Sequence, residues 1–400
     1  MFPAATLTAF VALAIGASAS PVKRDSLITL QLAKTVNTTV PQHIPAADRA
    51  RVKRLLGKST SVGVGVGLNQ AVTYTANVDV GSPPTTYNLI VDTGSANTWV
   101  GADKSYTPTN TSKWTGNLVE VIYGSGSFIG NEYTDTVTLV EGLAIPNQMI
   151  GVAVDSTGFT AVDGVLGIGP VGLTNGTLLP NTTSLVPTVT NNLFTLGTIP
   201  GNIVSVSFVP ANENGTATGE LTFGGTDSTK FTGDVVYTPV TTVSPANHYW
   251  GINQDVSYGS QSLLLGSSGF VDTGTTLTLI ASDAFAVYQN ATGGILDIMT
   301  GLLTITEDQL TNLQSLYFNI ENTMFEMTPN AQVWPRSLNT AIGGSADSIY
   351  LVVGDLGQSS GQGLDFINGM TFLERFYSVY DSENTRVGFA TTPFTNATTN

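Results

Sequence analysis

The tetrapeptide Val-Asp-Thr-Gly occurs twice in the chain, at residues 91–94 and 271–274, and its two aspartates are 180 residues apart. Each copy follows a short apolar run and precedes an apolar pair seven and eight residues after the aspartate. Each half of the chain later holds an apolar stretch interrupted by glycine, VDGVLGIG at 162–169 and LDFINGMTF at 364–372. A repeat of roughly 170 residues predicts two similar lobes, since solenoid repeats have periods of about 20–50 residues.

Both halves are predicted to be mainly β. Short runs rich in Val, Tyr, Thr and Phe alternate in polarity and are bounded by Gly, Pro or Asn, which is typical of strands. These runs lie at residues 71–81, 117–124, 219–225, 234–240, 249–259, 348–356 and 374–381. Helical patterns are few: Ser282–Gln289 begins with a Ser-Asp capping signal, and Glu307–Leu316 is amphipathic.

Charged residues make up 11 % of the chain, against about a quarter in a usual soluble protein, and they are unevenly spread. Residues 1–60 hold eight of the 14 basic residues and two of the 29 acidic ones, so the rest of the chain has a net charge of −21. This asymmetry indicates a basic segment that lies against an acidic body, with a basic disordered tail as the alternative. Nucleic acid is disfavoured as a partner, because the acidic body repels phosphates.

The first residues predict export. Residues 1–19 are apolar and end in the small-x-small pattern of a cleaved secretory signal. A membrane anchor is disfavoured, because the apolar run of about 16 residues is shorter than the roughly 20 that span a bilayer. We therefore expect a secreted, extracellular protein. Its Asn-x-Ser/Thr glycosylation candidates are Asn37, Asn110, Asn175, Asn181, Asn214, Asn290 and Asn396.

Residues 20–60 are interpreted as a basic propeptide, in which 46–58 combine good helix formers with a basic face. The glycine-alternating stretch at 61–67 is typical of an exposed linker, so we expect maturation cleavage between about Lys58 and Leu68. The predicted lobes are then 61–245, with the first repeat, and 246–400, with the second.

The repeated aspartates, Asp92 and Asp272, suggest a catalytic device. Alone, each copy is explained as an ordinary turn, but two copies in matching places of matching halves are harder to dismiss. Two buried carboxyls that lie close together repel each other when both are ionised. The pair therefore shares one proton in acid solution. One carboxylate can then deprotonate a water while its protonated partner hydrogen-bonds a carbonyl oxygen, which is sufficient for peptide hydrolysis. Gly94 and Gly274 allow a sharp turn and close backbone approach.

The residues beside the aspartates fit this chemistry. Thr93 and Thr273 are placed to hydrogen-bond across the axis that relates the halves, and Ser95 and Thr275 are placed to reach the carboxylates. Residues 117–139 form two strand-like runs around a Gly-Ser-Gly tip, which predicts a hairpin. Taken alone it is explained as an ordinary surface hairpin with Tyr123 on one face, but a catalytic pair needs a cover that excludes water, and we expect this hairpin to supply it.

The composition narrows the chemistry further. The chain has no cysteine, which excludes thiolate catalysis and cysteine-ligated metals. It has two histidines, His43 in the basic segment and His248 in the body. An aspartate dyad needs no metal and no cofactor, and we expect neither. With six basic residues in the body, few carboxylates can form ion pairs, so we expect acid to cost the body little stability.

The sequence resembles the pepsin-type aspartic proteases, in particular their secreted members from wood-decay basidiomycetes. The resemblance covers residues 70–395 and rests on the two Asp-Thr-Gly motifs, Tyr123-Gly124-Ser125-Gly126, DGVLGIG, YWGI and the C-terminal FLERFYSVYDSENTRVGFA. It implies a bilobal β fold whose long cleft holds Asp92 and Asp272 at its base. Tyr123 would be the flap tyrosine, and Trp99 would bond its hydroxyl.

The resemblance also implies how substrate is held. The substrate backbone would lie between Gly124 and Ser125 above and Gly94, Gly274 and Thr276 below. The main specificity pocket would be lined by Ile90, Val162 and Val165, with Tyr249 on the other side of the scissile bond. The expected partners are protein or peptide substrates, pepstatin-like inhibitors and the chain's own propeptide; we expect a monomer.

The chain departs from the family in two places. Ile367-Asn368-Gly369-Met370 stands where many relatives have Leu-Gly-Asp, which puts local packing in doubt. The family's inhibitory lysine would be Lys53 or Lys58. Besides an acid endopeptidase, two alternatives are a pepsin-like fold used only for binding, whose known examples lose one aspartate motif or the flap tyrosine, and a glycosidase, which also uses two carboxylates.

Overall fold

The computed structural model describes residues 27–36, 43–57, 72–124, 126–211 and 217–400. The predicted signal segment, the glycine-alternating linker, Asn37, Lys58, Ser125 and Asn214 lie outside these residues. Strands from both halves of the chain share one 14-stranded sheet. In order across the sheet its strands are β12 (Thr232–Pro239), β24 (Arg386–Thr391), β23 (Phe376–Asp381), β10 (Ile203–Phe208), β11 (Thr218–Phe223), β1 (Ile28–Val36), β2 (Val72–Val80), β3 (Thr85–Asp92), β8 (Gly164–Gly167), β4 (Trp99–Val100), β7 (Leu143–Thr157), β6 (Ser127–Val140), β5 (Lys113–Ile122) and β9 (Leu178–Leu179).

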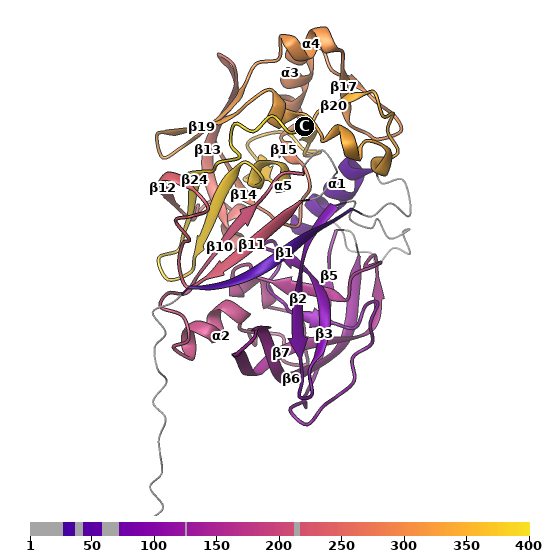
Figure 1. Ribbon diagram of the computed structural model, residues 1–400, viewed down its shortest axis with the longest axis vertical. Coiled ribbons are helices and arrows are strands. Elements are labelled where there is room, and N and C mark those ends of the chain that lie inside the picture. Colours follow the sequence, from indigo (N-terminus) through magenta and orange to yellow (C-terminus); the bar gives the residue numbers. More distant parts are fainter. Residues whose placement is uncertain (1–26, 37–42, 58–71, 125, 212–216) are drawn as a thin grey trace, which may run out of the picture.

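The second half adds two smaller sheets, so the described chain forms two β lobes (Figure 1). The seven-stranded sheet contains β19 (Thr323–Met327), β18 (Leu316–Ile320), β13 (Gly251–Tyr258), β14 (Gln261–Val271), β22 (Phe366–Asn368), β15 (Thr278–Ile280) and β21 (Val353–Asp355). The three-stranded sheet contains β16 (Ile295–Leu296), β17 (Leu303–Ile305) and β20 (Ile349–Tyr350).

The described α-helices are α1 (Ile44–Leu55), α2 (Val189–Thr195), α3 (Ser282–Thr292), α4 (Glu307–Thr311) and α5 (Met370–Leu373), and the 3-10 turns are η1 (Val171–Thr174), η2 (Ala246–His248), η3 (Asn330–Gln332), η4 (Arg336–Leu338) and η5 (Thr340–Ile342). Both helices predicted in the second lobe exist. The predicted cap of α3 is wrong, because its N-cap is Ala281 and the Ser282 hydroxyl donates to Asp355. Helix α4 ends before the predicted Leu316, which begins β18. No described helix has the length and apolar character needed to cross a membrane.

The predicted internal repeat is confirmed by strand pairing. In the first lobe, β3 pairs in parallel with β8, and β8 pairs antiparallel with β4. In the second lobe, β14 pairs in parallel with β22, and β22 pairs antiparallel with β15. The glycine-interrupted stretches of the sequence are β8 and β22. Each therefore supports the strand that ends at one of the two aspartates.

The unusual Asn368 of β22 is accommodated by an amide pair. Its side chain is fully buried and donates to Gln254 Oε1 at 2.9 Å, and Gln254 Nε2 donates back to Asn368 Oδ1 at 3.3 Å. Gln254 lies in β13, whose sequence alternates buried and less buried residues as a strand should. The packing doubt raised by the sequence is thus resolved by two reciprocal hydrogen bonds.

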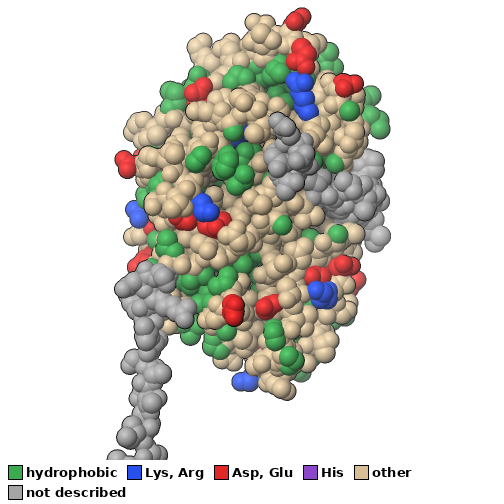
Figure 2. All heavy atoms as spheres, in the orientation of Figure 1, with side chains coloured by type: hydrophobic (Ala, Val, Ile, Leu, Met, Phe, Trp, Pro, Cys, Tyr) green, Lys and Arg blue, Asp and Glu red, His purple; other side chains and the backbone are tan. Residues whose placement is uncertain are grey.

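The segment interpreted as propeptide is folded into the body. Strand β1 lies antiparallel between β11 and β2, and helix α1 lies between the two lobes (Figure 1). In β1, Ile28, Leu30 and Leu32 are buried at every second position, as the strand period requires. Figure 2 shows charged side chains thinly scattered over a face that is mostly uncharged polar groups and backbone.

Candidate active site

The two aspartates lie side by side at the centre of the molecule. Asp92 ends β3 and Asp272 follows β14, and both are almost completely buried. As predicted, the neighbouring threonines hydrogen-bond across the axis between the lobes. The backbone N–H of Thr93 donates to Thr273 Oγ1 at 2.9 Å, and that of Thr273 donates to Thr93 Oγ1 at 2.9 Å. These bonds lock the two turns in register.

Each carboxylate is held by the same donors from its own turn. Gly94 N–H lies 2.9 Å from Asp92 Oδ1 and the Ser95 hydroxyl lies 2.6 Å from Asp92 Oδ2. In the second lobe Gly274 N–H lies 2.9 Å from Asp272 Oδ1, and Thr275 Oγ1 lies 2.6 Å from Asp272 Oδ2. The predicted contacts of Ser95 and Thr275 are therefore present.

The two glycines are required by the closeness of the opposite carboxylate. A Cβ atom at Gly94 would lie 2.7 Å from Asp272 Oδ1, and one at Gly274 would lie 2.6 Å from Asp92 Oδ1. Real Cβ atoms do not approach oxygen so closely. A larger residue at either position would collide with the opposite carboxylate and with Arg51 Nη2, which lies nearer still.

Arg51 of α1 lies between the aspartates. Its Nη2 donates to Asp92 Oδ1 at 2.6 Å and to Asp272 Oδ1 at 3.0 Å, and its Nε donates to Asp272 Oδ2 at 2.7 Å. The expectation of an inhibitory lysine at Lys53 is wrong, because Lys53 is exposed. Helix periodicity is the reason: Ile44, Arg51 and Val52 share the buried face of α1, and Lys53 does not.

The guanidinium separates the pKa values of the two aspartates. Burial pushes the pKa of both carboxyls up. At Asp272 the Arg51 charge and its hydrogen bonds outweigh burial and lower the pKa, whereas at Asp92 burial and the Asp272 charge prevail and the pKa is raised. Burial disfavours the charged form of Arg51 and by itself lowers its pKa. The two neighbouring carboxylates outweigh burial, so the pKa of Arg51 is raised.

The predicted covering hairpin consists of β5 and β6, which pair antiparallel up to Ile122 and Ser127. Tyr123 lies at its tip, and the predicted hydrogen bond is present: Trp99 Nε1 donates to the Tyr123 hydroxyl at 2.8 Å. Trp99 stacks on Phe128 at a ring distance of 4.2 Å. The predicted pocket residues Ile90, Val162 and Val165 belong to the same buried apolar cluster.

The other predicted substrate-binding residues contact the propeptide segment. A Cβ atom at Gly124 would collide with the Arg51 backbone, so α1 packs tightly under the hairpin. The Tyr249 hydroxyl donates to the carbonyl oxygen of Leu55 at 3.1 Å. Thr276 N–H donates to Asp48 Oδ1 at 3.2 Å. Helix α1 thus occupies the place predicted for substrate.

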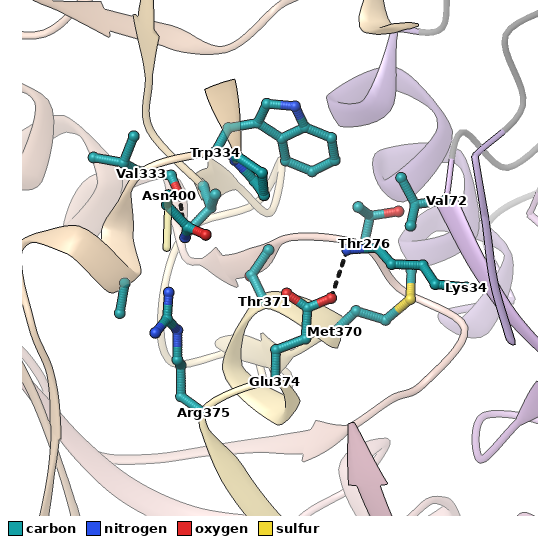
Figure 3. A pocket seen from close by; sticks show the side chains of 13 residues that line it. Lys34, Val72, Thr276, Val333, Trp334, Met370, Thr371, Glu374, Arg375 and Asn400 are labelled. Atoms are coloured by element: carbon teal, nitrogen blue, oxygen red, sulfur yellow. Dashed lines mark hydrogen bonds and ion pairs between the residues drawn. The ribbon is translucent and has the colours of Figure 1, made fainter. Parts of the chain in front are cut away.

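A second buried ion pair anchors the same segment. Lys34 of β1 lies 2.7 Å from Glu374 Oε1, with the two side chains 3 % and 7 % exposed, and the Tyr74 hydroxyl donates to the same oxygen at 2.8 Å. Figure 3 shows Lys34 and Glu374 joined beside Thr276. Sequence reasoning missed Lys34, Asp48 and Arg51; the charge asymmetry pointed to their segment but not to their contacts.

A cavity of about 340 Å³ remains beside Arg51, lined by residues of the hairpin and of both predicted cleft walls, including Gly94, Tyr123 and Tyr249. Asn175, a glycosylation candidate, is among the residues that line it.

The glycosylation candidates that the structure describes are all exposed, namely Asn110, Asn175, Asn181, Asn290 and Asn396.

The family model for eukaryotic aspartyl proteases matches residues 73–392. The chain therefore belongs to this family and is an aspartic endopeptidase with the pepsin-like bilobal fold. It is similar to polyporopepsin from Irpex lacteus, with 64 % identity over 333 residues that cover 83 % of this chain and 98 % of the relative. Human gastricsin is 29 % identical over 338 residues, covering 80 % and 81 %. The crystal structure of the aspartic proteinase from Irpex lacteus matches with a TM-score of 0.82 at 56 % identity, covering 94 % of this chain and all of that one.

Proposed function

We propose that Asp92 and Asp272 form the catalytic dyad of this endopeptidase and that the chain is made as a secreted zymogen. One observation carries the proposal: two buried carboxylates, related by the internal repeat and held by matching donors, share one guanidinium. A cation bound between two carboxylates marks a place where negative charge must be neutralised.

The reaction follows from removal of Arg51. Without that cation, repulsion between the carboxylates favours a dyad that holds one proton. The ionised carboxylate takes a proton from a water, which attacks the scissile carbonyl carbon, and the protonated carboxyl hydrogen-bonds the carbonyl oxygen. A proton then passes to the leaving nitrogen as the C–N bond breaks. Tyr123 and the hairpin exclude bulk water from these steps.

The preference for bulky hydrophobic residues rests on the apolar cluster beside the dyad. Ile90, Val162 and Val165 belong to one buried apolar cluster, and as the lining of the predicted pocket they would offer aliphatic carbon against which a large apolar substrate side chain gains from burial. Mapping the cuts in a peptide library by mass spectrometry tests this preference. Cuts beside charged residues would contradict it.

The zymogen proposal rests on the two ion pairs of the basic segment. Arg51 covers the dyad and Lys34 anchors β1, so the segment blocks substrate while the carboxylates stay ionised. Arg51 lowers the pKa of Asp272, so this stabilising contact is lost as the pH falls through the lowered value, which favours release in acid. The apolar N-terminal segment supports secretion, and with it glycosylation at the exposed Asn-x-Ser/Thr sites.

The dyad is tested by cleavage of a denatured protein at acid pH by the secreted chain. We expect Asp92→Asn and Asp272→Asn each to abolish cleavage, and pepstatin to block the wild-type enzyme. Asp347→Asn is the matched control, because Asp347 is exposed. Full activity of either dyad variant would refute the proposal.

A further inference from the structure

The two lobes differ at one pair of equivalent positions beside the aspartates. In the second lobe β14 lies between β13 and β22, and Gln254 and Asn368 hydrogen-bond to each other from these flanking strands. The hydrogen-bonded side chains therefore connect β13 to β22 across β14, the strand that precedes Asp272. In addition, the backbone carbonyl of Asn368 accepts a hydrogen bond from the Asp272 N–H at 3.1 Å.

Strand register identifies the equivalent pair in the first lobe. Val271 pairs with Asn368 as Val91 pairs with Leu166. Gln254 lies opposite Ser267, four residues before Val271, and Val78 lies opposite Tyr87 at the same distance before Val91.

Val78 and Leu166 are both fully buried in the apolar core. In the first lobe, two apolar residues thus occupy the positions that the amide pair occupies in the second lobe. Two buried amides are tolerated only when each is hydrogen-bonded, whereas an apolar pair carries no such condition. The first lobe shows that an apolar pair can fill these positions, so packing alone does not explain the polar pair of the second lobe.

We propose that Gln254 and Asn368 are positioning residues for catalysis: their amide pair holds the Asn368 carbonyl against the Asp272 N–H and so fixes the Asp272 carboxylate relative to Asp92. The inference rests on the proposed dyad. At the equivalent positions beside the strand that ends at Asp92, the first lobe has the apolar pair Val78 and Leu166 instead. The strands beside the two aspartates are therefore held by different side-chain pairs. Such a difference is consistent with a dyad in which one carboxyl takes a proton from water and the other hydrogen-bonds the carbonyl oxygen.

Three variants separate positioning from stability: Gln254→Leu, Asn368→Leu and the double variant, which copies the apolar pair of the first lobe. Each single variant leaves a buried amide unpaired and should lower the melting temperature. The double variant removes both amides and should recover most of that loss, because replacing both partners by apolar groups is nearly neutral. We nevertheless expect its kcat to stay about tenfold below wild type, with KM unchanged and the pH profile of kcat/KM displaced.

Wild-type kcat and an unmoved pH profile in a well-folded double variant would overturn the inference, since a purely structural pair is replaced without loss. If the double variant does not fold, Asn368→Asp decides. Its protonated carboxyl keeps both hydrogen bonds, so we expect kcat near wild type at low pH and a growing deficit as the new carboxyl ionises. A deficit of the same size at every pH, or none, would overturn it. Residual activity of Asp272→Asn would instead refute the dyad itself, which keeps the two failures distinct.

Discussion

The Nε atom of Arg51 lies 2.7 Å from Oδ2 of Asp272, and both side chains are withdrawn from water. Two desolvated charges of opposite sign stabilise each other, and removing one of them leaves the other at a cost of several kcal/mol. Departure of α1 therefore exposes the dyad to water or substrate at once. In the zymogen that we propose, this contact couples release of the segment to formation of an active dyad.

The hydrogen bond between Trp99 and Tyr123 should affect catalysis through the hairpin. Tyr123→Phe removes the acceptor and leaves the buried Trp99 N–H unpaired, which costs about 1–3 kcal/mol. We expect kcat/KM to fall by about tenfold when the hairpin is less firmly placed. Steady-state kinetics on a peptide substrate measure this. Tyr133→Phe, in the same hairpin, is the control and should leave the rate unchanged; equal rates for both variants would contradict the role of Tyr123.

Asp48 should give binding of the propeptide segment a second pH dependence. Its carboxylate lies on the buried face of α1 and accepts the N–H groups of Thr276 and Leu277 at 3.2 and 2.9 Å. Burial, reinforced by the Asp272 charge, raises its pKa to about 7 despite these bonds and despite Arg51. In the released segment the ordinary pKa of 3.8 applies. The protonated form therefore favours binding, fully so below about pH 4, and this contribution is lost as the pH rises through about 7.

Inhibition of the mature enzyme by added segments spanning residues 20–57 measures this effect. The ratio of the wild-type inhibition constant to that of Asp48→Asn should rise with pH by up to tenfold per unit between about pH 4 and pH 7. An Arg49→Gln segment is the control, and its ratio should not follow this trend. A ratio for Asp48→Asn that stays flat over the same range would show that the carboxyl does not titrate in the cleft.

Asp135 should make the body sensitive to strong acid. It is fully buried, and its carboxylate accepts hydrogen bonds from Tyr106, Thr111 and Ser112. Burial raises its pKa, but these hydroxyls and the Thr136 N–H outweigh burial, so the pKa is lowered. The resulting stability is present above the ordinary pKa and is lost as the pH falls through the lowered one.

Urea unfolding of the mature enzyme between pH 2 and 6 tests this account of Asp135. We expect Asp135→Asn to lose about 3 kcal/mol of unfolding free energy at pH 6, with the difference from wild type shrinking in strong acid. Asp347→Asn is the exposed control. A constant difference at every pH would contradict the account. The result would also correct our expectation that acid costs little stability, because counting basic residues overlooked hydroxyl donors.

Much of the candidate site could be predicted from the sequence because its chemistry is local. The repeated Val-Asp-Thr-Gly motif places each aspartate, glycine and hydroxyl within one turn, so their mutual contacts follow from spacing. The hairpin tip at Tyr123 is also local. These elements appear in the structure where the sequence predicted them.

The contacts of α1 and β1 were not predictable in the same way, because they depend on docking. Which residue of a basic helix meets the dyad is decided by the face that the body buries, and Arg51 rather than Lys53 lies on that face. The alternation of Ile28, Leu30 and Leu32 is a local strand signal, but it does not indicate which strands β1 pairs with. The Gln254–Asn368 pair joins residues 114 apart in sequence, so no local pattern indicated it.

The initial rate of peptide cleavage at pH 6 by the full-length chain, measured in the first minutes before any propeptide is cut, shows whether Arg51 holds the dyad inactive. Arg51→Gln should raise this initial rate at least about tenfold, because the neutral side chain no longer neutralises Asp92 and Asp272. Lys53→Gln, two residues along the same helix and exposed, should leave the rate at the wild-type level. Equal initial rates for wild type and Arg51→Gln would contradict the claim that Arg51 holds the dyad inactive.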